Sequence, residues 1–194
     1  MSVAYLRTES GSILPLEVDR WQAPPAPEDL DVLHRAWPPV LDIGCGPGRH
    51  SLALALRAVL VLGIDASPAA VSLARSRGAP VLLRSVFDPV PGAGRWRTAL
   101  LLDGNIGICG DPAAMLGRVA ELLAPGGKVL AELGPPGEET RSHRVRIERD
   151  DQATPWFPWA TVGADAVWAL AAASGFCVDE VWHSGDRWFA QLAR

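Results

Sequence analysis

The chain has 194 residues, of which 48% are hydrophobic and 21% charged, and its formal net charge at pH 7 is −4. This length and apolar content allow one substantial hydrophobic core, so we expect a single domain over residues 1–194. The negative charge gives no general attraction to nucleic acid or to an anionic membrane, and no apolar run reaches the roughly 18 residues that cross a bilayer, so we expect neither partner.

The first 39 residues combine a short strand or loop over residues 3–18 with a proline-rich stretch. Between the prolines, Glu28–Trp37 has the spacing of one short helix. The apolar residues that this helix would bury are Leu30, Leu33 and Trp37. We interpret residues 1–39 as a flap or lid that precedes the main fold.

From Pro39 onward, apolar strand-like runs alternate with helix-like segments. The strand candidates are Val40–Ile43, Val59–Ile64, Val81–Leu83, Thr98–Leu102 and Val129–Leu133. Such alternation is typical of a parallel sheet with helices on both faces. We therefore predict a doubly wound α/β fold, with its ligand-binding core over residues 40–133.

Helix start and stop signals lie between these strands. Ser67 before Pro68 supplies an N-cap and a residue suited to the first helical turn, and Gly78 supplies a stop. Asp111 and Pro112 repeat the start signal before a second helix. The segment 49–57 alternates as a strand would, and only its position between two strands favours a helix.

The pattern changes after Leu133. Residues 134–162 predict an inserted loop followed by a half-exposed strand over His143–Arg149, and we interpret them as a small substrate-side insertion. In residues 163–194, Ala164–Ser174 predicts a helix that stops at Gly175. The two apolar runs after it, 176–183 and 187–192, predict a terminal antiparallel hairpin.

A glycine-rich turn follows the first strand of this core. Gly44, Gly46 and Gly48 come directly after the apolar run Val40–Ile43, and such a turn lets the backbone approach a ligand closely. Asp65 ends the next strand, where a carboxylate can accept hydrogen bonds from both hydroxyls of a ribose. Together they indicate a ligand of the adenosine type.

The glycine spacing fits a dinucleotide fingerprint imperfectly, because the third glycine comes one residue early. At this point the sequence resembles the class I S-adenosylmethionine (SAM)-dependent methyltransferases, whose first motif is similar to Leu41–Gly48. The resemblance covers residues 40–133, about half of the chain. It implies a Rossmann-like, mostly parallel seven-stranded sheet, SAM as cofactor and S-adenosylhomocysteine as product.

Further segments carry the same resemblance. Phe87 and Asp88 stand where this family places an acidic residue against the adenine, Asp103–Asn105 where it binds the methionine portion, and residues 121–130 resemble its fifth strand and the turn before it. The residues to which the resemblance assigns cofactor binding are Asp42, Gly44, Cys45, Gly46, Gly48, Asp65, Ala66, Phe87, Asp88, Asp103, Gly104 and Asn105. No Asn-Pro-Pro-Tyr-like motif follows Asp103, which argues against methylation of nucleic-acid bases.

Methyl transfer from a sulfonium is an in-line displacement that needs alignment more than covalent catalysis. If the acceptor needs a general base, His143 is the first candidate, because it opens the inserted strand. The alternatives are His34, His50 and His183 and the carboxylates of Asp19 and Asp103. The three cysteines are far apart and show neither zinc-site pairing nor a disulfide framework. We expect reduced thiols, no metal and, since the N-terminus lacks a secretory pattern, a cytoplasmic protein.

The insertion also supplies a candidate acceptor wall. Its charged and aromatic members, together with one flap residue, are Trp21, Arg144, Arg146, Trp156 and Trp159. They would suit an anionic or aromatic small molecule, but a solvated strand face and ordinary core packing explain them equally well. We expect a small-molecule acceptor. The sequence specifies neither its identity nor the oligomeric state. An NAD(P)-dependent oxidoreductase and a SAM-binding protein without catalysis remain the alternatives.

Overall fold

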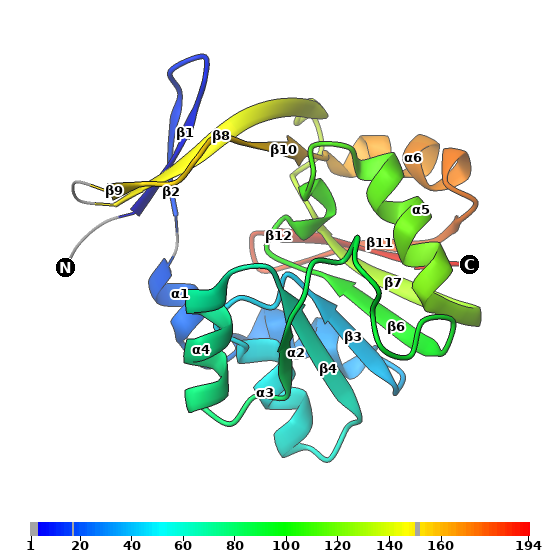
Figure 1. The fold of residues 1–194 in the computed structure, drawn as a ribbon. Helices are drawn as coiled ribbons and strands as arrows, with labels where there is room; N and C mark the ends of the chain where they lie inside the picture. Colours follow the sequence, from blue (N-terminus) through cyan, green and yellow to red (C-terminus); the bar gives the residue numbers. More distant parts are fainter. Residues whose placement is uncertain (1–3, 17, 150–151) are drawn as a thin grey trace.

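The computed structural model describes residues 4–16, 18–149 and 152–194, and its main body is a seven-stranded sheet (Figure 1). The strand order is β11-β12-β7-β6-β3-β4-β5. The strands are β3 (Val40–Ile43), β4 (Val61–Asp65), β5 (Val81–Leu83), β6 (Trp96–Leu101), β7 (Leu123–Leu133), β11 (Cys177–Ser184) and β12 (Arg187–Ala193). Strands β3 to β7 pair in parallel, and β12 pairs antiparallel with both of its neighbours. The predicted doubly wound sheet and terminal hairpin are confirmed.

Helices cover both faces of this sheet (Figure 1). They are α2 (Pro27–His34), α3 (Arg49–Leu56), α4 (Pro68–Ser76), α5 (Pro112–Leu122) and α6 (Val167–Ala173). Successive strand residues point to opposite faces, so Leu41 and Ile43 pack with α5 and α6, whereas Val40 packs with α2 and α3. The two apolar clusters make the carboxyl edge of the sheet a rigid platform for the loops that follow the strands.

The capping signals read from the sequence are present. Ser67 Oγ accepts a hydrogen bond from the Ala70 amide at 3.3 Å, and Asp111 Oδ1 accepts one from the Ala114 amide at 3.0 Å. The ambiguous segment is helix α3, as its context predicted. Strand β7 begins at Leu123, earlier than expected, and Gly126 within it has φ +71° where a turn was predicted.

The prediction for residues 28–37 was partly wrong. Helix α2 ends at His34, and Leu30 and Trp37 are 37% and 49% exposed instead of buried. Trp37 precedes Pro38, whose ring disfavours helical backbone at the residue before it, so the helix cannot extend that far. Val32 and Leu33 form the buried face of α2.

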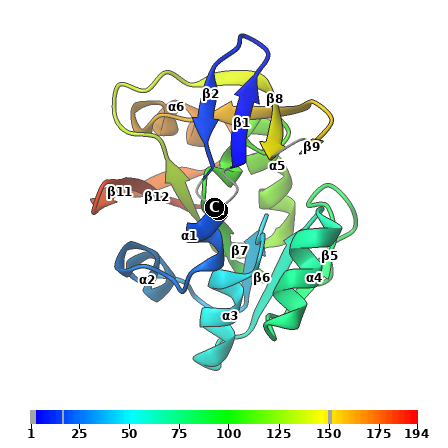
Figure 2. The same ribbon diagram turned by 90° about the vertical axis from the view of Figure 1, so that its left-hand side faces the viewer.

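A second sheet, which we call the flap sheet, joins the N-terminus to the insertion (Figure 2). Its strands are β1 (Ala4–Thr8), β2 (Ile13–Pro15), β8 (Arg141–Arg149), β9 (Gln152–Ala153) and β10 (Phe157–Thr161), in the order β10-β8-β1-β2 with β9 beside β8. Strands from the two segments that the sequence presented as a separate flap and insertion thus pair in one sheet. A short helix, α1 (Val18–Gln22), leads from β2 back to the main body, and a 3₁₀ turn, η2 (Ala164–Ala166), precedes α6.

Strand β10 also contacts the main body. Trp159 forms an isolated antiparallel bridge with Ile108, next to the 3₁₀ turn η1 (Asn105–Gly107) that follows β6. A Cβ at Gly107 would collide with the Ala160 carbonyl, so only glycine allows this approach. In the described part of the chain no helix is long and apolar enough to span a membrane.

Candidate active site

The glycine turn and Asp65 meet at the carboxyl edge of the sheet. The amides of Gly44 and Cys45 both donate to the Ile64 carbonyl, at 2.8 and 3.0 Å, and the Gly46 amide donates to Asp65 Oδ2 at 2.8 Å. Because β3 and β4 are parallel neighbours, their ends lie side by side. The structure therefore brings together the two features from which the sequence predicted an adenosine site.

Two of the glycines are required for different reasons. Gly46 has φ +52°, and a Cβ built on it would meet no atom within 4 Å, so the turn leaves open space there. Gly44 has φ +70°, and its Cβ would lie 2.6 Å from Asn105 Nδ2. Gly46 thus forms an open cradle, whereas Gly44 allows a close approach within the protein.

Asp65 is half-buried, and its carboxylate is held in place by the backbone. While Oδ2 accepts from Gly46, Oδ1 accepts from the Ser67 amide at 2.8 Å, at the start of α4. A carboxylate oxygen has a second lone pair, so each retains capacity for a ligand donor. Asp65 is therefore a fixed acceptor beside the open cradle.

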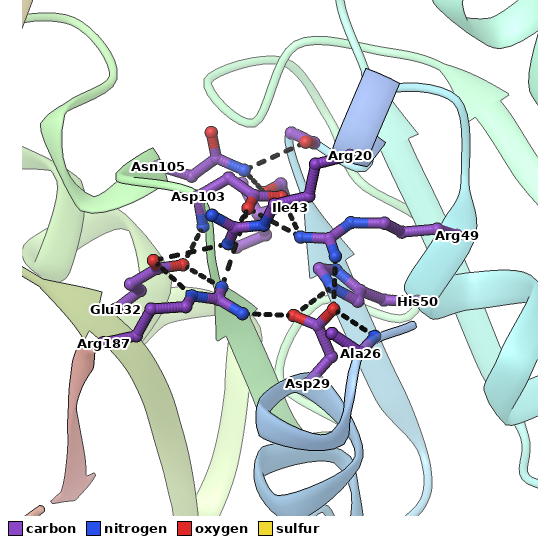
Figure 3. A network of polar contacts seen from close by, with 11 residues as sticks. Arg20, Ala26, Asp29, Ile43, Arg49, His50, Asp103, Asn105, Glu132 and Arg187 are labelled. Atoms are coloured by element: carbon purple, nitrogen blue, oxygen red, sulfur yellow. Dashed lines mark hydrogen bonds and ion pairs between the residues drawn. The ribbon is translucent and has the colours of Figure 1, made fainter. Parts of the chain in front are cut away.

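The loop after β6 reaches back to the glycine turn. Asp103 and Gly104 have φ values of +54° and +77°, and this tight turn aims Asn105 at the end of β3. Asn105 Nδ2 donates to the carbonyls of Ile43 and Gly44, at 2.9 Å each (Figure 3). Residues 103–105, which the resemblance assigns to the methionine portion, lie against the glycine turn.

A network of charged side chains lies beneath this loop and was not predicted (Figure 3). It contains three arginines, three carboxylates and one histidine: Arg20, Arg49, Arg187, Asp29, Asp103, Glu132 and His50. These side chains come from α1, α2, α3, the end of β6, β7 and β12. The only sequence signal was Arg49 and His50 directly after the glycine turn, and their partners are far away along the chain.

Asp29 and Asp103 share Arg49. The Asp103 carboxylate accepts from Arg49 Nη2 at 2.6 and 2.8 Å and from Arg20 Nη2 at 3.0 Å, and Arg49 Nη1 also contacts Asp29. On the other side of the network, Arg187 binds Glu132 at 2.5 and 2.8 Å and Asp29 at 2.6 Å. Each carboxylate therefore has at least one arginine partner.

Asp29 is fully buried, and burial alone would favour its neutral form. Hydrogen bonds from His50 and Arg187 and the charges of His50 and Arg49 outweigh this effect and hold the pKa of Asp29 well below its usual range. Burial likewise disfavours the charged form of Arg187, but its bonds to Glu132 and Asp29 raise the pKa of Arg187. Both shifts favour the charged forms of Asp29 and Arg187, so this ion pair is maintained at neutral pH.

Asp42 and Cys45, both assigned to cofactor binding, are buried. Asp42 accepts a hydrogen bond from Ser51 Oγ at 2.7 Å, and burial raises the pKa of its carboxyl group. Burial also raises the pKa of the Cys45 thiol, so this cysteine is no activated nucleophile. If either residue contacts the cofactor, the contact comes from its backbone.

The segment after β5 is exposed, as a ligand-facing position requires. Phe87 is 45% exposed and Asp88 is also exposed, as is Ala66, which follows β4. Arg118 holds this segment, since it donates to the Val86 and Asp88 carbonyls at 2.8 Å each. Cofactor contacts by these residues stay predictions.

A cavity of about 140 Å³ adjoins the Asp103–Asn105 loop, because Gly104 is part of its lining. Its lining comes from the ends of β6 and β7, from the loop after β7 and from β10, and includes Gly104, Glu132, Gly134, Glu138, Trp159 and Thr161. This cavity is the candidate acceptor pocket, because Gly104 belongs both to it and to the loop that contacts the glycine turn.

The predicted acceptor residues are only partly gathered here. Trp159 lines the cavity. Arg144 lies on β8 with Glu9 at 3.1 Å, and Arg146, also on β8, binds Glu148 at 2.5 Å and lies 4.9 Å from the Trp156 ring centre. The structure does not bring Arg144, Arg146 or Trp156 into the cavity lining.

His143 and Trp21 are half-buried and have no established role. His143 lies on β8 opposite Trp159 of β10, one strand away from the cavity wall, and Trp21 lies in α1. Their functions stay predictions. Over residues 4–16, 18–149 and 152–194 there is no group of three or more His, Cys, Asp or Glu side chains that could hold a metal ion.

Comparison with known proteins finds methyltransferases. Residues 40–127 match the family model of a methyltransferase domain. A trans-aconitate 2-methyltransferase of Paracidovorax citrulli is 34% identical over 131 residues, 66% of this chain and 48% of that protein. One of Methylobacterium radiotolerans is 35% identical over 134 residues, with the same two coverages. The chain spans about half the length of the curated relatives it matches.

Solved structures share the fold over nearly the whole chain. A SAM-dependent methyltransferase from Bacteroides fragilis in complex with S-adenosyl-L-homocysteine superposes with a TM-score of 0.80, at 24% identity, and 98% of this chain and 86% of that chain are covered. The CcbJ methyltransferase from Streptomyces caelestis gives 0.65 at 17% identity, with 90% and 91% covered.

The sheet with its antiparallel last strand and the glycine turn after β3 define a Rossmann-like methyltransferase fold. Within that class, the domain match over residues 40–127 and the relatives support a class I SAM-dependent methyltransferase.

Proposed function

We propose that this protein transfers a methyl group from SAM to a small molecule. The observation that carries the proposal is the open space above Gly46 beside the fixed carboxylate of Asp65. The family match adds support, and so does the complex of the Bacteroides fragilis neighbour with S-adenosylhomocysteine. A cytoplasmic location belongs to the same proposal and is consistent with three free cysteines.

The residues present fit the adenosyl part of SAM. Asp65 would accept hydrogen bonds from the ribose hydroxyls, Gly46 would let the backbone lie close to the ligand, and Asp88 would face the adenine. The Asp103–Asn105 loop would bind the methionine portion, because Asn105 already joins this loop to the glycine turn. When bound, SAM supplies a methyl group on a positively charged sulfur.

The contribution of the protein to the reaction is alignment. The Asp103 carboxylate is fixed by Arg49 and Arg20, and Asn105 is fixed by the end of β3. Groups that cannot move keep donor and acceptor in line, which can lower a barrier by several kcal/mol without a covalent intermediate. The cavity beside Gly104 would hold the acceptor.

The acceptor does not follow from the relatives. The Paracidovorax citrulli relative is a trans-aconitate 2-methyltransferase, but the chain covers only 48% of that protein. A small molecule suits the cavity of about 140 Å³.

Calorimetric titration tests this function. We expect S-adenosylhomocysteine to bind with one site per chain and NAD to show no heat of binding, because the third glycine stands one residue early for a pyrophosphate. Binding of NAD without S-adenosylhomocysteine would establish the oxidoreductase alternative. S-adenosylhomocysteine binding without methyl transfer to any of a broad set of acceptors would favour a non-catalytic SAM-binding protein.

A further inference from the structure

The chemistry of the acceptor cavity deepens the proposed function. The cavity has walls from the main body and from the flap sheet: Gly104 and Glu132 on one side, Trp159 and Thr161 of β10 on the other. Gly104 precedes Asn105, which contacts Gly44 of the glycine turn at 2.9 Å. A molecule in this cavity would therefore lie next to the proposed methionine site.

The charge of the cavity is negative. Two of its lining residues are glutamates, Glu132 and Glu138, and no Lys, Arg or His is among the described residues that line it. The carboxylate of Glu132 is already satisfied, because it binds Arg187 at 2.5 and 2.8 Å and accepts from the Asp103 amide at 2.6 Å.

Glu138 differs from Glu132. Across the described ranges, its carboxylate takes part in no hydrogen bond and no ion pair. It lies directly over the backbone at the end of β7, since a Cβ at Gly134 would collide with Glu138 Oε2. Glu138 is exposed to solvent, and it is the glutamate of the lining that has no protein partner among the described residues.

The loop that carries Glu138 is held at both ends. The Gly134 amide donates to the Val162 carbonyl at 2.8 Å, and the Gly137 amide donates to Asp165 Oδ2 at 2.7 Å. Beyond Glu138, the Gly163 amide donates to Thr140 Oγ1 at 3.3 Å. These bonds fix the loop against the segment after β10, so the position of Glu138 is defined by the fold.

Trp159 supplies an aromatic wall near the same loop. A Cβ at Gly104 would lie 3.5 Å from Trp159 Cζ2, so the indole packs directly against the turn that begins at Asp103. An indole attracts cations to its face, and a carboxylate binds ammonium through charge-assisted hydrogen bonds. Both features of the cavity therefore favour a cationic ligand.

We propose that the methyl acceptor is a small amine, with its ammonium form held by Glu138 and Trp159. The ammonium first loses a proton to water. The nitrogen lone pair then forms the new N–C bond to the methyl carbon while the S–C bond breaks with its electron pair remaining on sulfur. Because only the neutral amine attacks, the rate of transfer rises with pH until the amine is deprotonated.

A carboxylate acceptor fits the same cavity poorly. The network beside it matches Arg20, Arg49 and Arg187 with three carboxylates, so no arginine charge is left in excess. Near the loop, Arg141 already contacts Glu139. An anion entering the cavity would meet Glu138 without a compensating cation.

Binding to the protein saturated with S-adenosylhomocysteine tests this inference. Propylamine, ethanolamine and benzylamine are titrated by calorimetry, with propionamide as a neutral analogue and trans-aconitate as an anion. We expect at least one amine to bind and the other two compounds to give no heat. Glu138→Gln is expected to weaken amine binding roughly 10-fold, whereas Glu139→Gln, the neighbouring glutamate outside the cavity, leaves it unchanged.

The affinity for S-adenosylhomocysteine is measured in every variant and is expected to stay constant, which confirms that each variant is folded. A second readout is transfer of a labelled methyl group from SAM to the amine that binds. The inference is overturned if Glu138→Gln binds amines as wild type does, or if trans-aconitate binds and no amine does. In both cases the methyltransferase function stands. Only a wild-type protein that fails to bind S-adenosylhomocysteine contradicts the proposed function itself.

Discussion

Asp65 forms two hydrogen bonds to the backbone before any ligand binds, one to the glycine turn and one to the start of α4. A carboxylate fixed in this way does not need to be reoriented when a ribose binds, so less conformational entropy is lost on binding. The same two bonds mean that removing the carboxylate also loosens the Gly46 amide.

We expect Asp65→Ala to weaken the binding of S-adenosylhomocysteine by roughly 10- to 100-fold, the equivalent of one or two charge-assisted hydrogen bonds. Calorimetry measures the change. Asp111→Ala is the control, because Asp111 also accepts a hydrogen bond from a backbone amide at a helix start but does not lie at the glycine turn. Asp111→Ala is expected to lower the free energy of unfolding by about 1 kcal/mol and to leave the affinity for S-adenosylhomocysteine unchanged. Equal affinity in wild type and Asp65→Ala would show that Asp65 does not bind the ligand.

Gly46→Ala tests the open cradle. The new methyl group meets no protein atom within 4 Å but stands where the ligand should lie, so we expect at least a 10-fold loss of affinity for S-adenosylhomocysteine. Gly78→Ala is a matched control, since Gly78 also has positive φ and open space around its Cβ position. Both variants should lose about 1 kcal/mol of stability from left-handed backbone strain. A similar affinity in both would show that no ligand lies over Gly46.

At the scale of the elements, the buried network joins helix α2 to strand β12 and to the start of α3. The single side chain of Asp29 contacts Arg49, His50 and Arg187. It therefore links α2, α3 and β12, which are far apart in the sequence. Such a network specifies how α2 packs, because a displaced helix would leave buried charges without partners.

Asp29→Asn is expected to destabilise the protein by roughly 3–5 kcal/mol at pH 7, since it leaves buried arginine charge uncompensated. The pKa of Asp29 is lowered by folding, so its contribution is complete above the unfolded pKa of about 4 and is lost as pH falls below that value. Urea unfolding of wild type and Asp29→Asn at pH 7 and at pH 3.5 measures the loss of stability and its dependence on pH. A difference between wild type and variant that stays constant or grows on acidification would contradict this assignment.

The sequence was sufficient for elements whose signals are local. The caps at Ser67 and Asp111 and the apolar spacing of α5 each depend on residues a few positions apart. Helix α3 was recovered only from its place between two strands, because Ser51–Leu56 alternates as a strand would. The glycine turn and Asp65 were also predictable, since parallel neighbouring strands must end at one edge.

The rest depends on contacts between distant residues. Pairing of β1 with β8 joins residues near positions 4 and 149, and no periodicity within either strand reveals its partner. The same holds for Asp29 and Arg187, which are in direct contact although they are 158 residues apart in the sequence. The cavity could not be predicted because it exists only where β10 approaches the end of β7.

At the scale of the whole molecule, the proposed cofactor site and the proposed acceptor site depend on different sheets. The seven-stranded sheet carries the glycine turn and Asp65, while the flap sheet supplies one wall of the cavity through β10 (Figures 1 and 2). None of the described strands of the main sheet pairs with β1 or β2. Cofactor binding and acceptor binding should therefore respond differently to changes in the flap.

Deletion of residues 1–16 tests this separation. It removes β1 and β2 and leaves β8 without its partner on one side. We expect affinity for S-adenosylhomocysteine to stay within roughly threefold of wild type, because β1 and β2 belong to the flap sheet and not to the sheet that carries Asp65. The KM for the acceptor is expected to rise. Calorimetry measures the affinity for S-adenosylhomocysteine, and steady-state kinetics measure the KM for the acceptor. Loss of S-adenosylhomocysteine binding with retained secondary structure would show that the two sites are not separate.

A crystal structure with S-adenosylhomocysteine tests the central claim most directly. The account predicts an adenosyl group over Gly46, with both ribose hydroxyls within hydrogen-bonding distance of the Asp65 carboxylate and with the sulfur on the Gly104 side, facing the cavity. A ligand bound elsewhere, or a glycine turn filled by the protein's own side chains, would contradict it.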